Sequence, residues 1–211
     1  MKSISKYQNI VNFYKKSINT HGLTNKGIGW DNHKALMLRY KNIANIIVKS
    51  RFKKNFSLLD LGCGLSGLYL FLIKKKFIFE YNGVDTSKKI ISFCKKKFKK
   101  NNYYNCDILK DSKKIGSYDI TILSGIFTIK NKLNNKEMYF YIFKVLKKIK
   151  KKTKGLIIIN FLTDNPDWKN KKNFYPNYDI LKKFIQTKIS KKFYILNLNK
   201  IFEKIIVINL N

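Results

Sequence analysis

The stretch LLDLGCGLSG, Leu58–Gly67, is the part of the sequence that most strongly indicates the fold. Its second part, GCGLSG, matches G-x-G-x-x-G, the glycine-rich turn between a strand and a helix that lets a ligand approach the backbone. In a dinucleotide site the pyrophosphate sits on the helix N-terminus, where Asp60, two residues before the first glycine, would repel it. The same carboxylate would attract an ammonium group. The turn therefore favours a ligand that carries a cation, and a dinucleotide site is the alternative.

Two more acidic residues stand at the ends of predicted strands. Asp85 ends the strand 79–85, where a carboxylate can accept both hydroxyls of a ribose in either type of fold. Asp107 ends the strand 103–107, where it can accept an adenine amino group while the N–H of Ile108 meets a ring nitrogen. Each acid alone could be a turn or cap residue, but only 12 of the 211 residues are acidic, so three at these positions are not expected by chance. S-adenosylmethionine carries an ammonium, a ribose and an adenine, and needs no phosphate site.

Strand and helix patterns alternate along the chain. Strands are predicted at 57–61, 79–85, 103–107, 118–125 and 155–162, and an antiparallel hairpin at 193–198 and 204–210. Helices are predicted at about 32–49, 68–76, 87–98, 134–149 and 177–187. The predicted N-caps are Asp31, Thr86 or Ser87, and Asn134 in a capping box with Glu137. This alternation predicts a doubly wound α/β fold of three layers, with a mostly parallel seven-stranded sheet and a C-terminal antiparallel hairpin.

The chain resembles the class I S-adenosylmethionine-dependent methyltransferases over roughly residues 55–211. LLDLGCG, YNGVD, YYNCDI and YDITILSGIF stand at the positions of that family's motifs. More narrowly, GLTNKGIGW, LMLRY, ILSGIF and IINFL resemble a group of small bacterial methyltransferases. The resemblance implies a Rossmann-like domain at 51–211 under an N-terminal helical cap, residues 1–50. It also implies S-adenosylmethionine as cofactor, with these binding residues: Trp30, Arg39, Asp60, Gly62, Cys63, Gly64, Asp85, Thr86, Asp107, Ile108 and Ser124.

Two residues of the predicted cap have alternative roles. Arg39 lies on the apolar face of its helix, and a buried arginine needs a carboxylate. That partner is either the methionyl carboxylate of the cofactor or a structural acid such as Asp60. Trp30 either covers the cofactor or acceptor pocket or packs the N-terminal segment on the sheet.

Methyl transfer is an in-line displacement, so the enzyme mainly aligns the reactants and excludes water. A base is needed only where the acceptor is protonated at the working pH. The candidate catalytic residues are His21, His33, Ser124 and Tyr175, and for each histidine a surface position is the alternative. The fourth strand ends in SGIF rather than [DN]PP[YF], which weighs against methylation of a base amino group. A small apolar acceptor site, suited to a small molecule, is predicted from Ser124, Gly125, Phe127, Asn160, Phe161 and Tyr175.

The formal net charge of +33 suggests nucleic-acid binding, yet only Arg39 and Arg51 are arginines. Lysine, asparagine, isoleucine, tyrosine and phenylalanine are all unusually frequent, which is the composition that an A+T-rich coding sequence would produce. An RNA-directed methyltransferase or RNA-binding module is therefore an alternative to a small-molecule enzyme. A NAD-dependent oxidoreductase and a catalytically idle methyltransferase-like partner protein are weaker alternatives.

The cysteines and the apolar runs argue against metal-binding, disulfide-bonded and membrane-spanning classes of protein. Cys63, Cys94 and Cys106 are widely spaced and predict neither a zinc site nor a disulfide framework. The longest uninterrupted apolar run, 68–73, is far too short for a membrane span, and the N-terminus lacks an apolar segment of signal-peptide length. We therefore expect a cytoplasmic protein without a metal.

Overall fold

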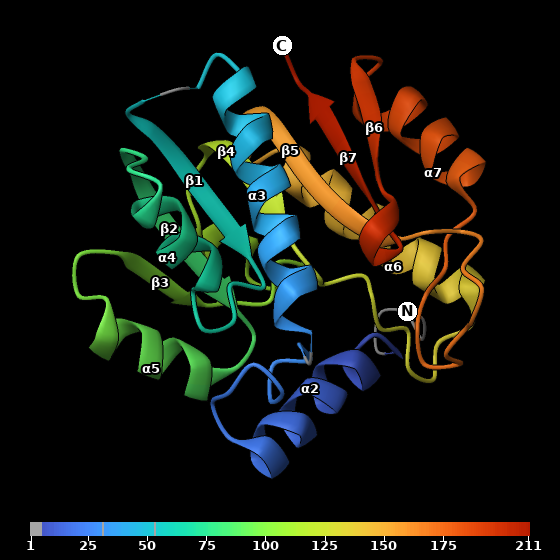
Figure 1. Ribbon diagram of the computed structural model, residues 1–211, viewed down its shortest axis with the longest axis horizontal. Helices are drawn as coiled ribbons and strands as arrows, with labels where there is room; N and C mark the ends of the chain where they lie inside the picture. Colours follow the sequence, from blue (N-terminus) through green and yellow to red (C-terminus); the bar gives the residue numbers. More distant parts are fainter. Residues whose placement is uncertain (1–5, 31, 53) are drawn as a thin grey trace.

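A single seven-stranded sheet forms the centre of the protein (Figure 1). The computed structural model describes residues 6–30, 32–52 and 54–211. The strand order is β3-β2-β1-β4-β5-β7-β6; β1 to β5 pair in parallel, and β7 is antiparallel to both β5 and β6. The strands are β1 Phe56–Leu61, β2 Phe79–Asp85, β3 Asn102–Asn105, β4 Tyr118–Leu123, β5 Thr153–Leu162, β6 Phe193–Leu198 and β7 Glu203–Asn209. The predicted fold class, including the closing hairpin, is confirmed.

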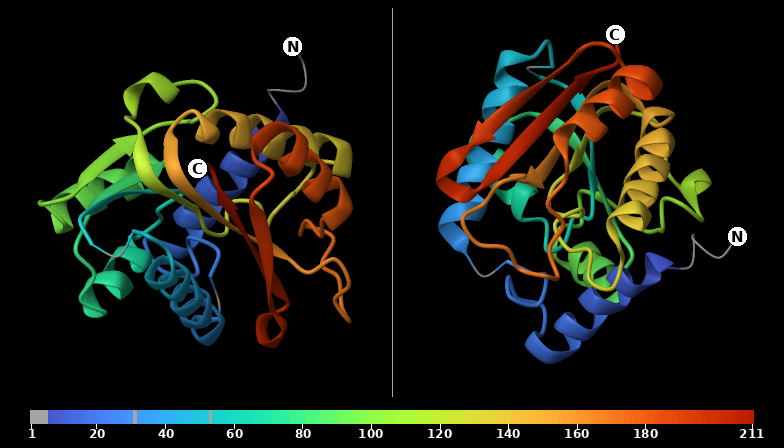
Figure 2. Two further views of the ribbon diagram at one scale, coloured as in Figure 1. Left: turned by 90° about the horizontal axis from the view of Figure 1, so that it is seen from above. Right: turned by 90° about the vertical axis from the view of Figure 1, so that its right-hand side faces the viewer.

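Helices cover both faces of the sheet and give three layers, with α3 and α6 on opposite sides (Figure 2). Buried residues of α3, α4 and α5 form one core cluster, and those of α6 and α7 belong to the cluster on the other face. The helices are α2 Gln8–His21, α3 His33–Lys49, α4 Gly67–Lys74, α5 Lys88–Lys97, α6 Asn135–Lys150 and α7 Tyr178–Phe184. Short helical turns lie at Ser112–Lys114, Ile185–Ile189 and Asn199–Ile201.

Polar caps fix where three of these helices begin. Asn134 and Glu137 form the predicted capping box at α6, and the Ser87 hydroxyl accepts the hydrogen bond that starts α5. At α3 the cap is the Asn32 side chain. Asp31, the predicted cap, lies outside the described residues.

Helix α2 is not among the helices predicted from the sequence. It crosses the carboxyl ends of the parallel strands (Figure 1). Ile10 packs in the core cluster of one sheet face and Ile18 in that of the other, so α2 bridges both faces at this edge. The spacing of Ile10, Tyr14 and Ile18 is the sequence signal for this helix.

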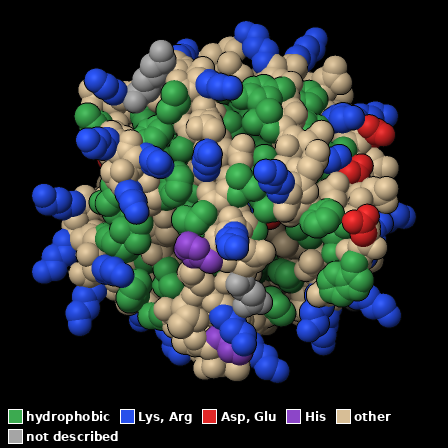
Figure 3. All heavy atoms as spheres, in the orientation of Figure 1, with side chains coloured by type: hydrophobic (Ala, Val, Ile, Leu, Met, Phe, Trp, Pro, Cys, Tyr) green, Lys and Arg blue, Asp and Glu red, His purple; other side chains and the backbone are tan. Residues whose placement is uncertain are grey.

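Lysine side chains are scattered over the face seen in Figure 3, and few acidic side chains lie among them. The C-terminal turns of α4, α5, α6 and α7 all carry lysines, and these helices lie on both sides of the sheet. In the described ranges no helix is both long enough and apolar enough to cross a membrane.

Candidate functional site

A cavity of about 430 Å³ lies at the carboxyl edge of the sheet and is lined in part by residues of α2 and of the loop 22–30. This volume is in the range of small-molecule sites. Parallel strands bring their carboxyl ends to one edge, so residues far apart in the sequence meet here. The predicted site residues that line the cavity are Trp30, His33, Asp60, Gly62, Cys63, Gly64, Asp85, Thr86, Asp107, Ile108, Ser124 and Gly125.

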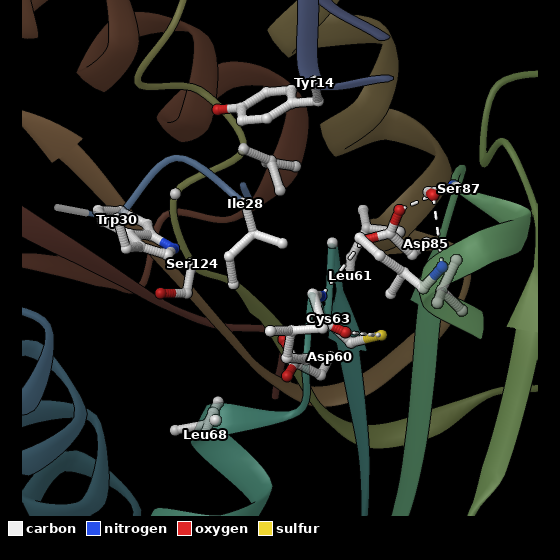
Figure 4. A pocket seen from close by; sticks show the side chains of 18 of the residues that line it. Tyr14, Ile28, Trp30, Asp60, Leu61, Cys63, Leu68, Asp85, Ser87 and Ser124 are labelled. Atoms are coloured by element: carbon white, nitrogen blue, oxygen red, sulfur yellow. Dashed lines mark hydrogen bonds between the residues drawn. The ribbon is translucent and has the colours of Figure 1, made fainter. Parts of the chain in front are cut away.

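The glycine turn forms the floor of the cavity. Gly64 has φ 50°, a left-handed conformation that costs a side chain strain, and a Cβ there would lie 3.0 Å from Ile28 Cδ1. Ile28 comes from the loop 22–30 and points into the cavity between Trp30 and Asp85 (Figure 4). The loop 22–30 thus contacts the turn directly, a contact the sequence pattern did not predict.

Asp60 is buried at the end of β1 and accepts a hydrogen bond from the Tyr81 hydroxyl at 2.7 Å. Burial raises the pKa of this carboxyl to about 7; the Tyr81 bond lowers it and the charge of Asp85 raises it further. Near neutral pH the carboxyl is therefore close to half protonated. A cation in the cavity would favour its ionised form.

Asp85 connects the glycine turn to helix α5. Its Oδ2 accepts the N–H of Gly64 at 3.2 Å, and its Oδ1 accepts the N–H of Ser87 at 2.9 Å. Burial raises its pKa, and these backbone bonds oppose the rise. A carboxylate oxygen has two lone pairs, so each oxygen keeps one acceptor position for a ligand hydroxyl.

Asp107 holds the N-terminal end of α2. Its Oδ2 accepts a hydrogen bond from the Tyr7 hydroxyl at 2.5 Å, and its Oδ1 accepts the N–H of Leu109 at 3.0 Å. The Tyr7 ring stacks on Tyr141 with 5.2 Å between centroids. Burial and the neighbouring Asp107 raise the pKa of Tyr7, so its hydroxyl stays a donor.

Arg39 does not line the cavity and does not pair with Asp60. It is fully buried, and its guanidinium donates to both carboxylate oxygens of Glu203, with 2.6 Å from Nε to Oε2. Glu203 also accepts from Asn160 Nδ2 at 3.0 Å, and Asn160 Oδ1 accepts the N–H of Gly125 at 2.6 Å. Sequence reasoning missed Glu203, although it is the only acidic residue after Asp179.

Half of the predicted catalytic set lies elsewhere. His21 is exposed at the end of α2 and does not reach the cavity. Tyr175 lines a different surface hollow with Pro176 and Lys204, and its hydroxyl accepts the N–H of Asn170 at 2.9 Å. The loop before α7 turns away from the cavity edge, which the sequence does not encode locally.

The predicted acceptor site is also only partly assembled. Ser124 and Gly125 line the cavity, but Phe127 and Phe161 stack on each other in the core, with 5.5 Å between centroids. Asn160 is buried beside Glu203 and does not line the cavity. Beyond Gly125 the chain turns inward and buries Phe127 on the α6 face, where it meets Phe161 of β5.

Comparison with known proteins tests the fold and the motif positions together. The family model described as a methyltransferase domain matches residues 52–203. The chain belongs to this methyltransferase family. No curated protein matches the chain.

Solved structures agree with this methyltransferase fold. Magnesium protoporphyrin IX methyltransferase from Synechocystis PCC 6803 with bound SAM has a TM-score of 0.62 at 13% identity, over 84% of this chain and 81% of that one. The N-methyltransferase NodS from Bradyrhizobium japonicum WM9, in complex with S-adenosyl-L-homocysteine, has a TM-score of 0.61 at 10% identity, over 85% and 89%. The methyltransferase domain of bacterial CtHen1 has a TM-score of 0.62 at 15% identity, over 83% and 100%. At these identities the likeness concerns the fold.

The methyltransferase domain also contains buried thiols beside the glycine turn. Cys63 and Cys94 are both buried, and both sulfurs lie near the Gly64 carbonyl oxygen, at 3.7 and 3.3 Å. Each thiol donates a hydrogen bond to that carbonyl. Within the described part of the chain, no group of three or more His, Cys, Asp and Glu side chains is placed to hold a metal ion.

Proposed function

We propose that the protein is an S-adenosylmethionine-dependent methyltransferase that acts on a small-molecule acceptor. The observation that carries the proposal is the meeting of Asp60, Asp85 and Asp107 around one cavity with the glycine turn. Family membership and structural neighbours solved with SAM or S-adenosylhomocysteine support it.

The residues present fit this cofactor. The buried carboxyl of Asp60, with a pKa of about 7, would hold an ammonium. Asp85 keeps acceptor positions for two ribose hydroxyls. Asp107 and Ile108, in the turn just after β3, would hold the adenine. The cofactor, when bound, supplies the activated methyl group.

The N-terminal residues, 1–50, act as the cap in this proposal. Tyr7, Tyr14 and Ile28 line the cavity from above, and a cavity closed by such apolar and aromatic groups excludes water. His33 and Ser124 are the two predicted catalytic candidates that line the cavity. For an acceptor protonated at the working pH, we assign His33 the role of general base.

The RNA-directed alternative rests on the charge of +33. The lysines of this protein, however, lie in the C-terminal turns of helices on both sides of the sheet. The lysines of these turns therefore do not form one basic stripe. The NAD-dependent alternative rests on GCGLSG and would set a pyrophosphate beside Asp60. Both are weaker than the small-molecule methyltransferase.

Calorimetry with S-adenosylhomocysteine and NAD tests the cofactor, and Asp85→Asn tests the site. We expect S-adenosylhomocysteine to bind and NAD not to bind. Asp85→Asn should weaken S-adenosylhomocysteine by about tenfold or more, because charge-assisted hydrogen bonds contribute roughly 1.5–3 kcal/mol. Because Asp85 also accepts two backbone N–H groups, circular dichroism must show that the variant is folded.

Asp179→Asn is the matched control, since the Asp179 side chain is 86% exposed and lies outside the cavity. It should bind like the parent. Tight NAD binding without any response to S-adenosylhomocysteine would refute the proposed function.

A further inference from the structure

Trp30 forms the wall of the cavity on the Ser124 side (Figure 4). One edge of its indole rests on Gly125, which has φ 85°, and a Cβ at Gly125 would overlap the ring. A residue with a side chain at this position would push the indole away. The indole of Trp30 can therefore occupy this position only because Gly125 has no side chain.

One face of the same indole is covered by a cation. The guanidinium carbon of Arg39 lies 4.0 Å from the centroid of the ring. Arg39 does not line the cavity, whereas Trp30 does. Because Arg39 covers one face, the indole can meet the cavity only with its other face or with an edge.

The cation is held in place by a buried polar network. Arg39 donates to both oxygens of Glu203, which Asn160 joins to the N–H of Gly125. The network thus fixes both neighbours of the indole, the guanidinium behind it and Gly125 at its edge. The two hydrogen bonds to Glu203 hold the guanidinium in its place over the indole.

This arrangement sets what the open side of the indole binds. An aromatic face is electron-rich and attracts cations. Here the guanidinium already draws the π electrons toward itself, so a second cation on the opposite face gains less. An electron-rich aromatic ring does not depend on cation–π attraction, so the guanidinium does not weaken its binding. Offset stacking of two aromatic rings is favourable.

We propose that Trp30 is the stacking platform for the methyl acceptor, that this acceptor carries a planar, electron-rich aromatic ring of the phenol type, and that the Arg39–Glu203 pair positions and tunes the platform. The name "acceptor" rests on the proposed function; the ring preference rests on the contacts of Trp30. Trp30 touches the bound ring, whereas Arg39 and Glu203 are positioning residues that act through it.

Trp30 itself can report the binding. The chain has two tryptophans, and Trp168 is 73% exposed, so Trp168→Phe leaves Trp30 as the single tryptophan, whose emission is excited selectively over that of the tyrosines. The variant is titrated with catechol, with trans-cyclohexane-1,2-diol, which has the hydroxyls without the aromatic face, and with phenyltrimethylammonium, which keeps an aromatic ring and adds a cationic, tetrahedral trimethylammonium group. We expect catechol to quench Trp30 and to bind about tenfold tighter than the other two. Equal affinity for the diol, or tighter binding of the cation, would overturn the proposal.

Each titration is run with and without S-adenosylhomocysteine. If S-adenosylhomocysteine does not bind, the proposed function fails, while the titrations without it still measure the ring preference. Trp30→Leu in otherwise unchanged protein, followed by calorimetry, should lose the catechol preference and keep its affinity for S-adenosylhomocysteine. Loss of S-adenosylhomocysteine binding in this variant would place Trp30 on the cofactor side and contradict the assignment.

The tuning by the ion pair has its own test. Arg39→Met combined with Glu203→Gln removes both buried charges together, which avoids leaving one of them unpaired. The affinity for phenyltrimethylammonium should then rise relative to catechol by about threefold or more, a change of selectivity that a purely structural role would not produce. Arg39→Lys keeps the positive charge, so it should leave the ratio close to that of the parent and serves as the charge control. An unchanged ratio in the folded double variant, or the same shift in Arg39→Lys, would refute the tuning.

Discussion

Asp60 occupies the end of a central strand, where both neighbouring strands exclude water from it. Such burial disfavours the charged form, and the pKa of about 7 places its titration in the physiological range. A bound ammonium reverses this effect, because it stabilises the carboxylate. Proton release from Asp60 and binding of an ammonium ligand are therefore linked.

We predict a pH-dependent affinity for S-adenosylhomocysteine. Below pH 7 Asp60 is mostly protonated in the free protein, so the affinity should fall as the pH drops from 8 to 6, with a limiting slope of about tenfold per pH unit. 5′-Methylthioadenosine, which lacks the amino-acid part, should show no such slope. Calorimetry at several pH values measures both.

Asp60→Asn is the control for this linkage. It cannot ionise, so the slope for S-adenosylhomocysteine should disappear while 5′-methylthioadenosine binds as before. If the parent and Asp60→Asn show the same slope, Asp60 is not the titrating group.

At the scale of the elements, α2 is held over the cavity by core packing of Ile10 and Ile18 and by side-chain hydrogen bonds. The hydrogen bond from Tyr7 to Asp107 and the stack of Tyr7 on Tyr141 attach its N-terminal end. Asp107 is also the residue assigned to the adenine. The helix and the ligand thus meet at one carboxylate.

Tyr7→Phe should loosen α2 without unfolding the protein. The ring stack is kept, but a hydrogen bond to a charged group, which contributes roughly 1.5–3 kcal/mol, is lost. Amide hydrogen exchange in α2 should accelerate by about tenfold or more, while exchange in α6 stays unchanged as the internal control. Equal protection of α2 in parent and variant would show that this bond does not hold the cap.

The elements that could be predicted from the sequence are those with a local pattern. Buried strands such as β5 are uninterrupted apolar runs between turn residues, and parallel topology then brings the acids at strand ends together. Contacts between distant segments carry no such pattern. Glu203 as the partner of Arg39 depends on how the hairpin aligns with β5, which no periodicity encodes.

Residues just beyond a strand were the other source of error. After Gly125, with φ 85°, the chain changes direction, so Phe127 enters the core although Ser124 lines the cavity. Successive side chains point to opposite faces of the sheet only within a strand. The alternation therefore cannot predict where a side chain beyond the strand end points. The same reason applies to Tyr175, which belongs to a loop.

At the scale of the whole molecule, the charge of +33 predicts weak, salt-sensitive contact with polyanions. Affinity for RNA falls with salt in proportion to the number of phosphates contacted. Because the lysines are spread over both sides of the sheet, we expect a gel shift with a 20-nucleotide RNA at low salt and none at about 0.15 M salt. A complex that persists at that salt would favour the RNA-directed alternative.

The Arg39–Glu203 pair also bears on how the chain is made. The two residues are 164 positions apart, so at ordinary synthesis rates the ribosome needs about 8–30 s to deliver Glu203 after Arg39. During that interval α3 carries a guanidinium without its carboxylate, and the sheet lacks β7, the strand between β5 and β6. The cavity wall at Trp30 is therefore completed only after synthesis of the C-terminal hairpin, among the last steps of folding.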